Sequence, residues 1–142
     1  MKTVCVSGYF DPAHVGHLDY LEGAAKYGKL VVILNSDAAA KRKKGYVFMP
    51  YEERKRMIEA LRCVDRVEPV DDHDGTVIKA LMRIKPDYFA NGGDRGKDNV
   101  PEQEICSMLG IEMLWGVGGE NKAQSSSRLV AESWDNLLGN LG

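Results

Sequence analysis

Apolar and polar residues follow one another along the chain with two alternating spacings, one typical of strands and the other of helices. Residues 3–7 form an apolar, β-branched run that predicts a buried strand. Residues 18–27 carry apolar side chains at helical spacing. Residues 29–35 are almost continuously apolar, the pattern of a strand covered on both faces of a parallel sheet. The chain is therefore predicted to begin with a strand–helix–strand unit.

The same alternation continues beyond this unit. Ser36 and Asp37 cap a short alanine-rich segment, and residues 41–50 are expected to form a basic and then aromatic loop. The remaining predicted elements are helix 51–63, strand 66–70, helix 76–84, strand 87–91, helix 101–109, strand 111–117 and a final helix that ends near Leu138. Helix 51–63 should place Met57, Ile58 and Leu61 on its inner face.

Strands that alternate with helices define the fold class. They predict an α/β chain with one domain over residues 1–142, built on a Rossmann-like, doubly wound, parallel five-stranded sheet with helices on both faces. Such sheets bind ligands at the carboxyl ends of their strands, where the strand order reverses. The unusual loops of this sequence, 8–17, 36–50, 92–100 and 118–125, all follow strand ends. We therefore expect them to surround one crevice.

Composition and charge narrow the class of protein. The chain has 142 residues, 44% of them hydrophobic, which suffices for one well-formed core. Its formal net charge is −2, so no overall positive field attracts nucleic acid. The three cysteines form no disulfide framework and no C-x-x-C pair, and Cys5 and Cys63 are expected to act as small hydrophobes. With no signal peptide and no membrane-spanning run, we expect a cytoplasmic protein without membrane contact.

The segment between the first strand and the first helix holds two of the three histidines. His14 and His17 lie three residues apart, so both can project from one side of the first helical turn. Gly16 between them lacks a Cβ and lets a ligand approach the backbone. Backbone N–H groups at a helix N-terminus and two imidazoles favour an anion such as a phosphate. The alternatives are two incidental histidines or a metal pair, although helical metal-binding histidines more often stand four apart.

Two further segments are candidates for phosphate binding. Ser125, Ser126 and Ser127 precede the last helix and offer hydroxyl and backbone N–H groups that can hold β- and γ-phosphates. A plain N-cap would need only one of these serines. The basic run from Lys41 to Lys44 is either a solvated surface or part of the same site.

Several of these segments resemble the signatures of one enzyme superfamily. His14-Val15-Gly16-His17 resembles the H-x-G-H motif of the nucleotidylyltransferases, and Gly8-Tyr9-Phe10-Asp11 resembles the G-x-F-D segment before it. Gly92-Gly93-Asp94 is similar to the G-G-D loop after the fourth strand, and Tyr51-Glu52-Glu53-Arg54 to the Y-E-x-R helix. The likeness covers nearly the whole chain and is strongest to the small cytidylyltransferase-like group.

The serine run departs from the last signature of that group. Gln124 replaces its usual isoleucine, and Val130 replaces the arginine of its longer form. Arg128 matches the lysine of its shorter form. The upstream arginine of some cytidylyltransferases is missing, and Lys122 is the candidate to replace it. The identity of the nucleotide base therefore stays open between adenine and cytosine.

The resemblance implies roles for individual residues. It implies that His14, His17 and Lys44 are catalytic, the histidines by hydrogen bonding to the triphosphate and the lysine by approaching the α-phosphate. The residues expected to bind the nucleotide are Gly8, Tyr9, Phe10, Gly16, Gly93, Asp94, Ser125, Ser126 and Ser127. The residues expected to bind the acceptor are Asp11, Lys43, Arg54, Asn91, Arg95, Lys122 and Arg128. No residue is assigned as a metal ligand.

Some of these residues have structural alternatives. Asp11 suits stabilisation of its turn as well as it suits orienting the site or assisting a metal, and Asp94 suits a tight turn. Arg54 can instead pair with neighbouring glutamates on a wet surface. We expect His73 and the acidic turn 71–75 to form a solvated loop. Trp115 and Trp134 are expected to pack rather than stack on a ligand.

The implied reaction transfers a nucleotidyl group. A phosphate monoester, already largely dianionic at neutral pH, attacks the α-phosphorus of ATP or CTP, and pyrophosphate leaves without a general base. The resemblance implies a sugar or polyol phosphate as acceptor, such as heptose 1-phosphate or glycerol 3-phosphate, and a homodimer. Mg²⁺ is expected because a triphosphate normally reacts as its metal complex. The alternatives are a non-catalytic nucleotide-binding regulatory module and a flavodoxin-like signalling domain, which Asp11 alone supports poorly.

Overall fold

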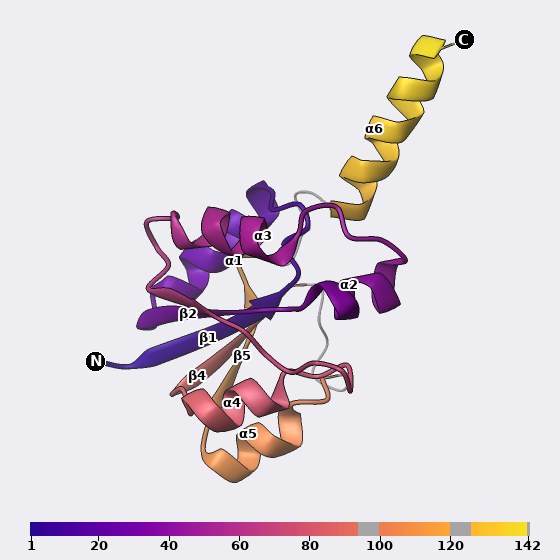
Figure 1. Ribbon diagram of the computed structural model, residues 1–142. Coiled ribbons are helices and arrows are strands. Elements are labelled where there is room, and N and C mark those ends of the chain that lie inside the picture. Colours follow the sequence, from indigo (N-terminus) through magenta and orange to yellow (C-terminus); the bar gives the residue numbers. More distant parts are fainter. Residues whose placement is uncertain (94–99, 120–125, 142) are drawn as a thin grey trace.

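The computed structural model describes residues 1–93, 100–119 and 126–141. Within these ranges five parallel strands form one sheet in the order β3-β2-β1-β4-β5 (Figure 1). The strands are β1 (Thr3–Gly8), β2 (Lys29–Leu34), β3 (Arg66–Glu68), β4 (Tyr88–Gly92) and β5 (Glu112–Val117). The helices are α1 (Val15–Ala25), α2 (Asp37–Lys44), α3 (Tyr51–Glu59), α4 (Ile78–Ile84), α5 (Gln103–Leu109) and α6 (Ser126–Leu141). The predicted five-stranded α/β fold is confirmed.

Helices cover both faces of the sheet, because successive strand residues point to opposite sides. Figure 1 shows α1 and α3 on one side of the sheet and α4 and α5 on the other. The core on the first side includes Val4, Val6, Leu30, Val32, Leu21 of α1 and Ile58 of α3. The core on the second side includes Cys5, Val31, Ile33, Leu81 of α4 and Cys106 of α5. The near-continuous apolar run of β2 therefore reflects burial on both faces, as predicted.

The cysteines belong to these cores. Burial raises the pKa of the Cys5 thiol to about 12 and that of Cys106 to about 11. Cys63 is partly buried and packs against the first core, and burial raises its pKa as well. All three are free thiols that stay protonated at neutral pH. The prediction that Cys5 and Cys63 act as small hydrophobes is confirmed.

The strand order reverses at β1. The chain passes from β1 through α1 to β2 and β3 on one side, and α4 then returns it to β4 and β5 on the other. The loops after β1 and β4 therefore flank the switch point, where sheets of this kind bind their ligands.

The turn after β1 requires a glycine at its start. Phe10 has a φ of 51°, in the left-handed region, and its buried ring lies against Gly8. A Cβ at Gly8 would stand 2.9 Å from Cε2 of that ring, which is closer than two carbon atoms pack. The absence of a side chain at Gly8 therefore leaves room for the buried Phe10 ring.

The basic run belongs to a helix, so the prediction of a loop over residues 41–44 is wrong. Ser36 caps α2 by accepting a hydrogen bond from the Ala39 N–H at 3.1 Å, and Gly45 ends the helix with a φ of 87°. Lys41, Arg42, Lys43 and Lys44 form its last turn. Cations at the C-terminal end of a helix are favoured by the helix dipole, which is why a run of like charges is helical here.

Helix α3 is shorter than predicted and faces the core differently. It ends at Glu59, with Ala60 as its C-cap, and does not reach residue 63. Ile58 is buried and Leu61 packs against the core, as predicted. Met57 is 61% exposed, so its predicted place on the inner face is wrong. Adjacent helical residues point about 100° apart, and only one of Met57 and Ile58 can face the sheet.

The two tryptophans differ in environment. Trp115 on β5 packs against the second core. Trp134 is 60% exposed, because α6 projects away from the rest of the chain (Figure 1). The prediction that both tryptophans pack is therefore wrong for Trp134. In the part of the chain that the structure describes, no helix has the length and apolar character needed to cross a membrane.

Candidate nucleotide-binding site

Both histidines of the first turn hold its backbone. His14 is the N-cap of α1, and its Nδ1 accepts a hydrogen bond from the Gly16 N–H at 3.1 Å. Nδ1 of His17 accepts the backbone N–H of His14 at 3.2 Å, which completes a reciprocal capping box. The two rings stack with centroids 3.8 Å apart and planes 20° apart. They lie on one side of the turn, as their spacing predicts.

This capping fixes which nitrogen of each ring donates. A neutral imidazole has one donor and one acceptor nitrogen, and both Nδ1 atoms are occupied as acceptors. The proton of each neutral ring is therefore assigned to Nε2. Phe10 meets the His17 ring edge-on at 4.7 Å between centroids and limits its rotation. The turn thus presents two oriented Nε2–H donors beside a helix N-terminus.

The start of α6 contacts the same turn. The buried Ser126 hydroxyl donates a hydrogen bond to the Pro12 carbonyl at 2.6 Å, across 114 positions of sequence. Arg128 is exposed, and its Nε lies 3.6 Å from Oε1 of Glu132, one turn further along α6. The first turn is therefore in contact with the start of α6, which directly follows the predicted 118–125 loop. Ser125, Lys122, Asp94 and Arg95 lie outside the described residues, as does the side chain of Ser127.

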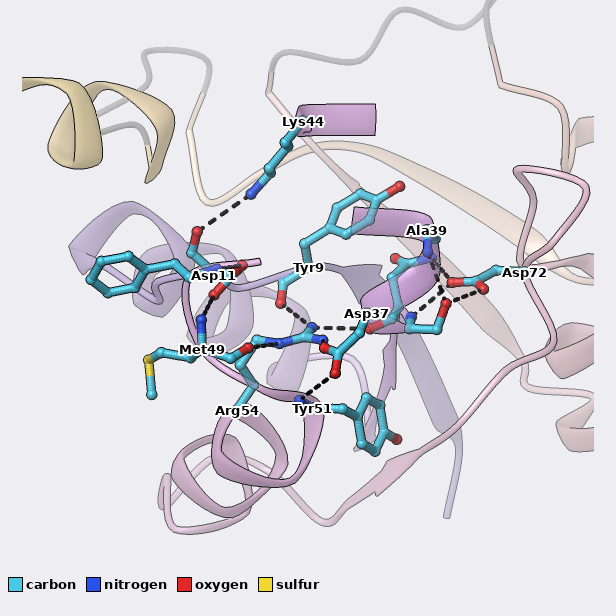
Figure 2. A network of polar contacts seen from close by, with 12 residues as sticks. Tyr9, Asp11, Asp37, Ala39, Lys44, Met49, Tyr51, Arg54 and Asp72 are labelled. Carbon is cyan, nitrogen blue, oxygen red and sulfur yellow. Dashed lines mark hydrogen bonds and ion pairs between the residues drawn. The ribbon is translucent and has the colours of Figure 1, made fainter. Parts of the chain in front are cut away.

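Two lysines at the end of α2 approach the turn from another direction. Nζ of Lys43 and of Lys44 lie 5.2 Å and 5.4 Å from the centre of the Tyr9 ring. Nζ of Lys44 also donates to the Asp11 carbonyl at 3.4 Å (Figure 2). Burial lowers the pKa of Lys44 below its ordinary value, and the Lys43 charge adds to this shift. Both lysines therefore lie beside Tyr9, and Lys44 also contacts Asp11, while their roles in catalysis and acceptor binding stay predictions.

Asp11 ties the turn to the loop after α2. Its side chain is 0% exposed, and its two carboxylate oxygens accept the backbone N–H groups of Phe48 at 2.7 Å and Met49 at 2.6 Å. Hydrogen bonds to a charged acceptor are stronger than those between neutral groups. Asp11 therefore stabilises the loop architecture of the site, as its structural alternative proposed, while its role in acceptor binding stays a prediction.

Arg54 of α3 is a buried cross-link under the site. It is 1% exposed, so the alternative of surface pairing with glutamates is wrong. Its guanidinium donates to the carbonyls of Met49 (2.9 Å), Tyr9 (2.8 Å) and Asn35 (2.9 Å) and to the carboxylate of Asp37 (2.5 Å). Figure 2 shows these partners converging on one side chain. A charge can be buried in this way because each of the three guanidinium nitrogens donates to at least one acceptor.

The acidic turn after β3 contains a residue that the sequence did not single out. His73, Asp71 and Asp74 are exposed, as predicted for a solvated loop. Asp72 is only 3% exposed, so that prediction is wrong for this residue. Its carboxylate accepts hydrogen bonds from Asn35 and Ser36 at the start of α2. No sequence signal separates Asp72 from its two acidic neighbours, because its burial depends on how the turn folds back.

The end of β4 carries two of the predicted site residues, Asn91 and Gly93. Asn91 is fully buried, and its Nδ2 donates to the Leu114 carbonyl of β5 at 3.2 Å. Gly93 follows β4 directly, at the switch point. The roles of Asn91 in acceptor binding and of Gly93 in nucleotide binding stay predictions.

The arrangement has the chemistry of a polyphosphate site. The N-termini of α1 and α6 meet beside two imidazole donors and two ammonium groups, at the carboxyl edge of a doubly wound sheet. Helix N-termini and cations bind phosphates in proteins. A doubly wound sheet with these groups at its carboxyl edge is the arrangement expected of an α/β nucleotidyltransferase. The chain belongs to the cytidylyltransferase-like family, whose model matches residues 5–130.

Individual proteins of known sequence or structure are similar to this chain. It is 39% identical over 124 residues to the bifunctional protein HldE of Yersinia pestis (strain Pestoides F) and to that of Yersinia pseudotuberculosis serotype O:1b. These matches cover 85% of this chain and 24% of each relative, so the chain spans about a quarter of their length. The crystal structure of a lipopolysaccharide core biosynthesis protein from Thermoplasma volcanium matches with a TM-score of 0.69 and 28% identity, over 81% of this chain and 95% of that one.

Proposed function

We propose that this chain transfers a nucleoside monophosphate from ATP or CTP to a phosphorylated small molecule and releases pyrophosphate. The observation that carries the proposal is the hydrogen bond between Ser126 and Pro12, which joins the N-terminus of α6 to the histidine turn. One triphosphate can then contact both groups. A sugar or polyol phosphate, such as heptose 1-phosphate or glycerol 3-phosphate, is the proposed acceptor. The name of the Thermoplasma relative, which assigns it to lipopolysaccharide core synthesis, supports a sugar.

The proposed mechanism is direct in-line attack. The acceptor phosphate is already a nucleophile at neutral pH, so the protein aligns the reactants and stabilises charge on the phosphoryl oxygens. Nε2–H of His14 and of His17 donates to those oxygens, and Lys44 neutralises charge at the α-phosphate. Asp11 and Arg54 stabilise the site, because their hydrogen bonds fix the histidine turn and the 45–50 loop. No covalent intermediate is required.

We propose that Mg²⁺ enters with the triphosphate. Magnesium usually keeps several water ligands and is held through substrate phosphates and one or two carboxylates. The described residues contain no group of three or more histidine, cysteine or acidic side chains able to hold a metal. In this proposal, phosphate and water supply most of the magnesium ligands. Chelation of Mg²⁺ is expected to abolish turnover.

We further propose that the protein is a cytoplasmic homodimer. The resemblance to the family motivates this proposal, and the exposed apolar residues Trp134, Leu137 and Leu138 on α6 offer surface for a subunit contact. Sedimentation should give twice the chain mass of 15.7 kDa, whereas a species of the chain mass at micromolar concentration would contradict the dimer.

A matrix of nucleotides and acceptors tests the proposed function. Each of ATP and CTP is incubated with Mg²⁺ and a panel of sugar and polyol phosphates, and released pyrophosphate is measured. One pair should turn over, and His17→Asn should slow it about 100-fold or more. His73→Asn is the matched control, since that histidine lies exposed in the turn after β3. Tight nucleotide binding without pyrophosphate release would favour the alternative of a non-catalytic, nucleotide-binding regulatory module. The departures from the family's serine signature at Gln124 and Val130 motivate this alternative.

A further inference from the structure

Asp72 is buried beyond β3, and its carboxylate faces the start of α2. It accepts hydrogen bonds from Nδ2 of Asn35 at 2.9 Å, from the Ser36 N–H at 2.9 Å and from the Ser36 hydroxyl at 2.6 Å (Figure 2). Burial by itself would raise the pKa of Asp72, but the hydrogen bonds from Ser36 and Asn35 outweigh it and leave the pKa below its ordinary value. The side chain is therefore a carboxylate at neutral pH.

The same residue also holds the second half of α2. Its backbone carbonyl accepts a hydrogen bond from the Arg42 guanidinium at 2.9 Å. Ser36 is the N-cap of this helix and Arg42 belongs to its last turn. Asp72 thus contacts α2 at both ends and restricts how it can tilt or rotate.

Helix α2 depends on such contacts more than a longer helix would. It has eight residues, and only Ala39 and Ala40 are buried. Helices shorter than about 12 residues are marginal in water without tertiary support. Its four consecutive cations also repel one another. A carboxylate at the N-terminus of the helix offsets part of this through hydrogen bonds and through the helix dipole.

The opposite end of α2 carries Lys44. Eight residues span only about 12 Å, so a tilt or a loss of helical order that begins at the N-cap reaches that lysine. Nζ of Lys44 lies 3.4 Å from the Asp11 carbonyl and over the Tyr9 ring, in a partly desolvated position. This position holds only while the helix keeps its orientation.

We propose that Asp72 is a positioning residue that acts through α2 to hold Lys44 in the nucleotide site. The part of this inference that concerns catalysis rests on the proposed function. The part that concerns the placement of Lys44 rests on the contacts of Asp72 alone. The two parts can therefore fail separately.

The placement is tested without substrates. Amine-specific labelling of Lys44, followed by mass spectrometry across a pH series, reports its pKa in each variant. In Asp72→Asn, an amide donor faces the donors of Asn35 and Ser36, so α2 should shift and the pKa of Lys44 should rise toward its ordinary 10.5. Asp71→Asn, which changes the adjacent exposed carboxylate, is the matched control and should leave Lys44 unchanged. An unchanged Lys44 in folded Asp72→Asn overturns the proposal.

A milder variant serves if Asp72→Asn does not fold. Ser36→Ala removes one of the three donors to Asp72 and the N-cap of α2. It should raise the pKa of Lys44 in the same direction by a smaller amount. No rise in this variant would also overturn the proposal.

Kinetics test the catalytic part. Asp72→Asn should lower kcat by about 10- to 100-fold, as misplaced groups do, at a temperature where the variant is fully folded. In a Lys44→Ala background the same substitution should have little further effect, because residues that act through one another are not additive. Additive losses, or a lower Tm with unchanged kcat, would contradict positioning through Lys44. If the unmodified protein releases no pyrophosphate with any pair, the proposed function fails while the labelling still decides the placement of Lys44.

Discussion

His14 serves the site through two different atoms of one ring. Nδ1 accepts the Gly16 N–H and caps α1, whereas Nε2 carries the proton that the proposed mechanism uses. The structural and the catalytic contribution can therefore be separated. Asparagine is among the preferred N-cap residues, and its side-chain oxygen can take the place of Nδ1 while nothing replaces Nε2.

His14→Asn and His14→Ala should differ in stability but not in activity. Both remove the Nε2–H donor, so kcat should fall about 100-fold or more in each. Only His14→Ala loses the cap, which should lower the free energy of unfolding by about 1 kcal/mol. Urea unfolding and pyrophosphate release measure the two quantities. Near-normal turnover in His14→Asn would contradict the assignment of Nε2.

Lys44 should give the reaction an alkaline limit. Its pKa lies below 10.5, mainly because of burial, and the charged form is the one proposed to act at the α-phosphate. With rising pH, kcat/KM, which reports groups of the free enzyme, should therefore fall before pH 10.5 is reached. Lys44→Arg keeps a positive charge at every accessible pH and should remove this limb from the pH profile, even if kcat is lower. If the loss of activity at high pH persists in Lys44→Arg, it arises from the titration of another group.

At the residue level, the sequence could indicate candidate positions but could not separate buried structural residues from accessible ones. The motif residues Asp11 and Arg54 were expected near substrate, and both are buried with their hydrogen-bonding atoms on neighbouring backbone or on Asp37. Asp72 was not expected to matter. Burial depends on which segments fold back over a residue, and no local pattern encodes that.

Among the elements, α3 is tied to the strands through Arg54. The guanidinium reaches the ends of β1 and β2, the start of α2 and the 45–50 loop. Without it, the carbonyls of Tyr9, Asn35 and Met49 would lose a donor in buried or partly buried surroundings, which costs more than the loss of a surface ion pair.

Arg54→Met should therefore lower the free energy of unfolding by about 3 kcal/mol, since each buried carbonyl left without a donor costs about 1–3 kcal/mol and Asp37 is partly solvated. The exposed residue Arg56 on the same helix provides the control. Arg56→Met should change the free energy of unfolding by about 0.5 kcal/mol or less. Urea unfolding at neutral pH measures both. Equal losses in the two variants would show that the buried hydrogen bonds contribute little.

The acidic turn after β3 should make the fold sensitive to acid. Hydrogen bonds from Lys79 and from the His73 backbone lower the pKa of Asp71 to about 2, and hydrogen bonds from Thr76 lower the pKa of Asp74. The pKa of Asp72 is lowered as well. These carboxyl groups bind protons more readily in the unfolded chain, where their pKa is near 3.8. Their contribution to the free energy of unfolding is therefore complete above pH 3.8 and is lost as the pH falls toward about 2.

Urea unfolding measured from about pH 5 to about pH 2 tests this element. The free energy of unfolding should decrease with falling pH, and Lys79→Met should make the decrease shallower by removing the main partner of Asp71. A free energy that is constant or rises on acidification would contradict the assigned hydrogen bonds.

Most elements could be predicted from periodicity, and the errors have identifiable causes. The strands were found because burial on two faces leaves a continuous apolar run, as in β2. Helix α2 was missed at residues 41–44 because its C-terminal charges resemble a solvated loop, although the dipole favours them. The exposure of Trp134 was missed because the sequence does not reveal that α6 projects away from the rest of the protein (Figure 1).

Over the whole molecule, the topology gave the most reliable prediction of the site. Loops after parallel strands meet at the carboxyl edge, and Ser126 does contact Pro12 across the chain. The H-x-G-H turn, the end of α2 and the start of α6 come together for this reason. Base and acceptor identity were left open by the sequence, and most residues of the 92–100 and 118–125 loops lie outside the described ranges.

The central claim is that the chain moves a nucleotidyl group rather than a phosphoryl group. Its most direct test uses the productive nucleotide with radioactive phosphorus at either the α or the γ position, together with the accepted sugar or polyol phosphate. We predict that the α label appears in the modified acceptor and the γ label in pyrophosphate. A γ label on the acceptor or in free orthophosphate would contradict the account.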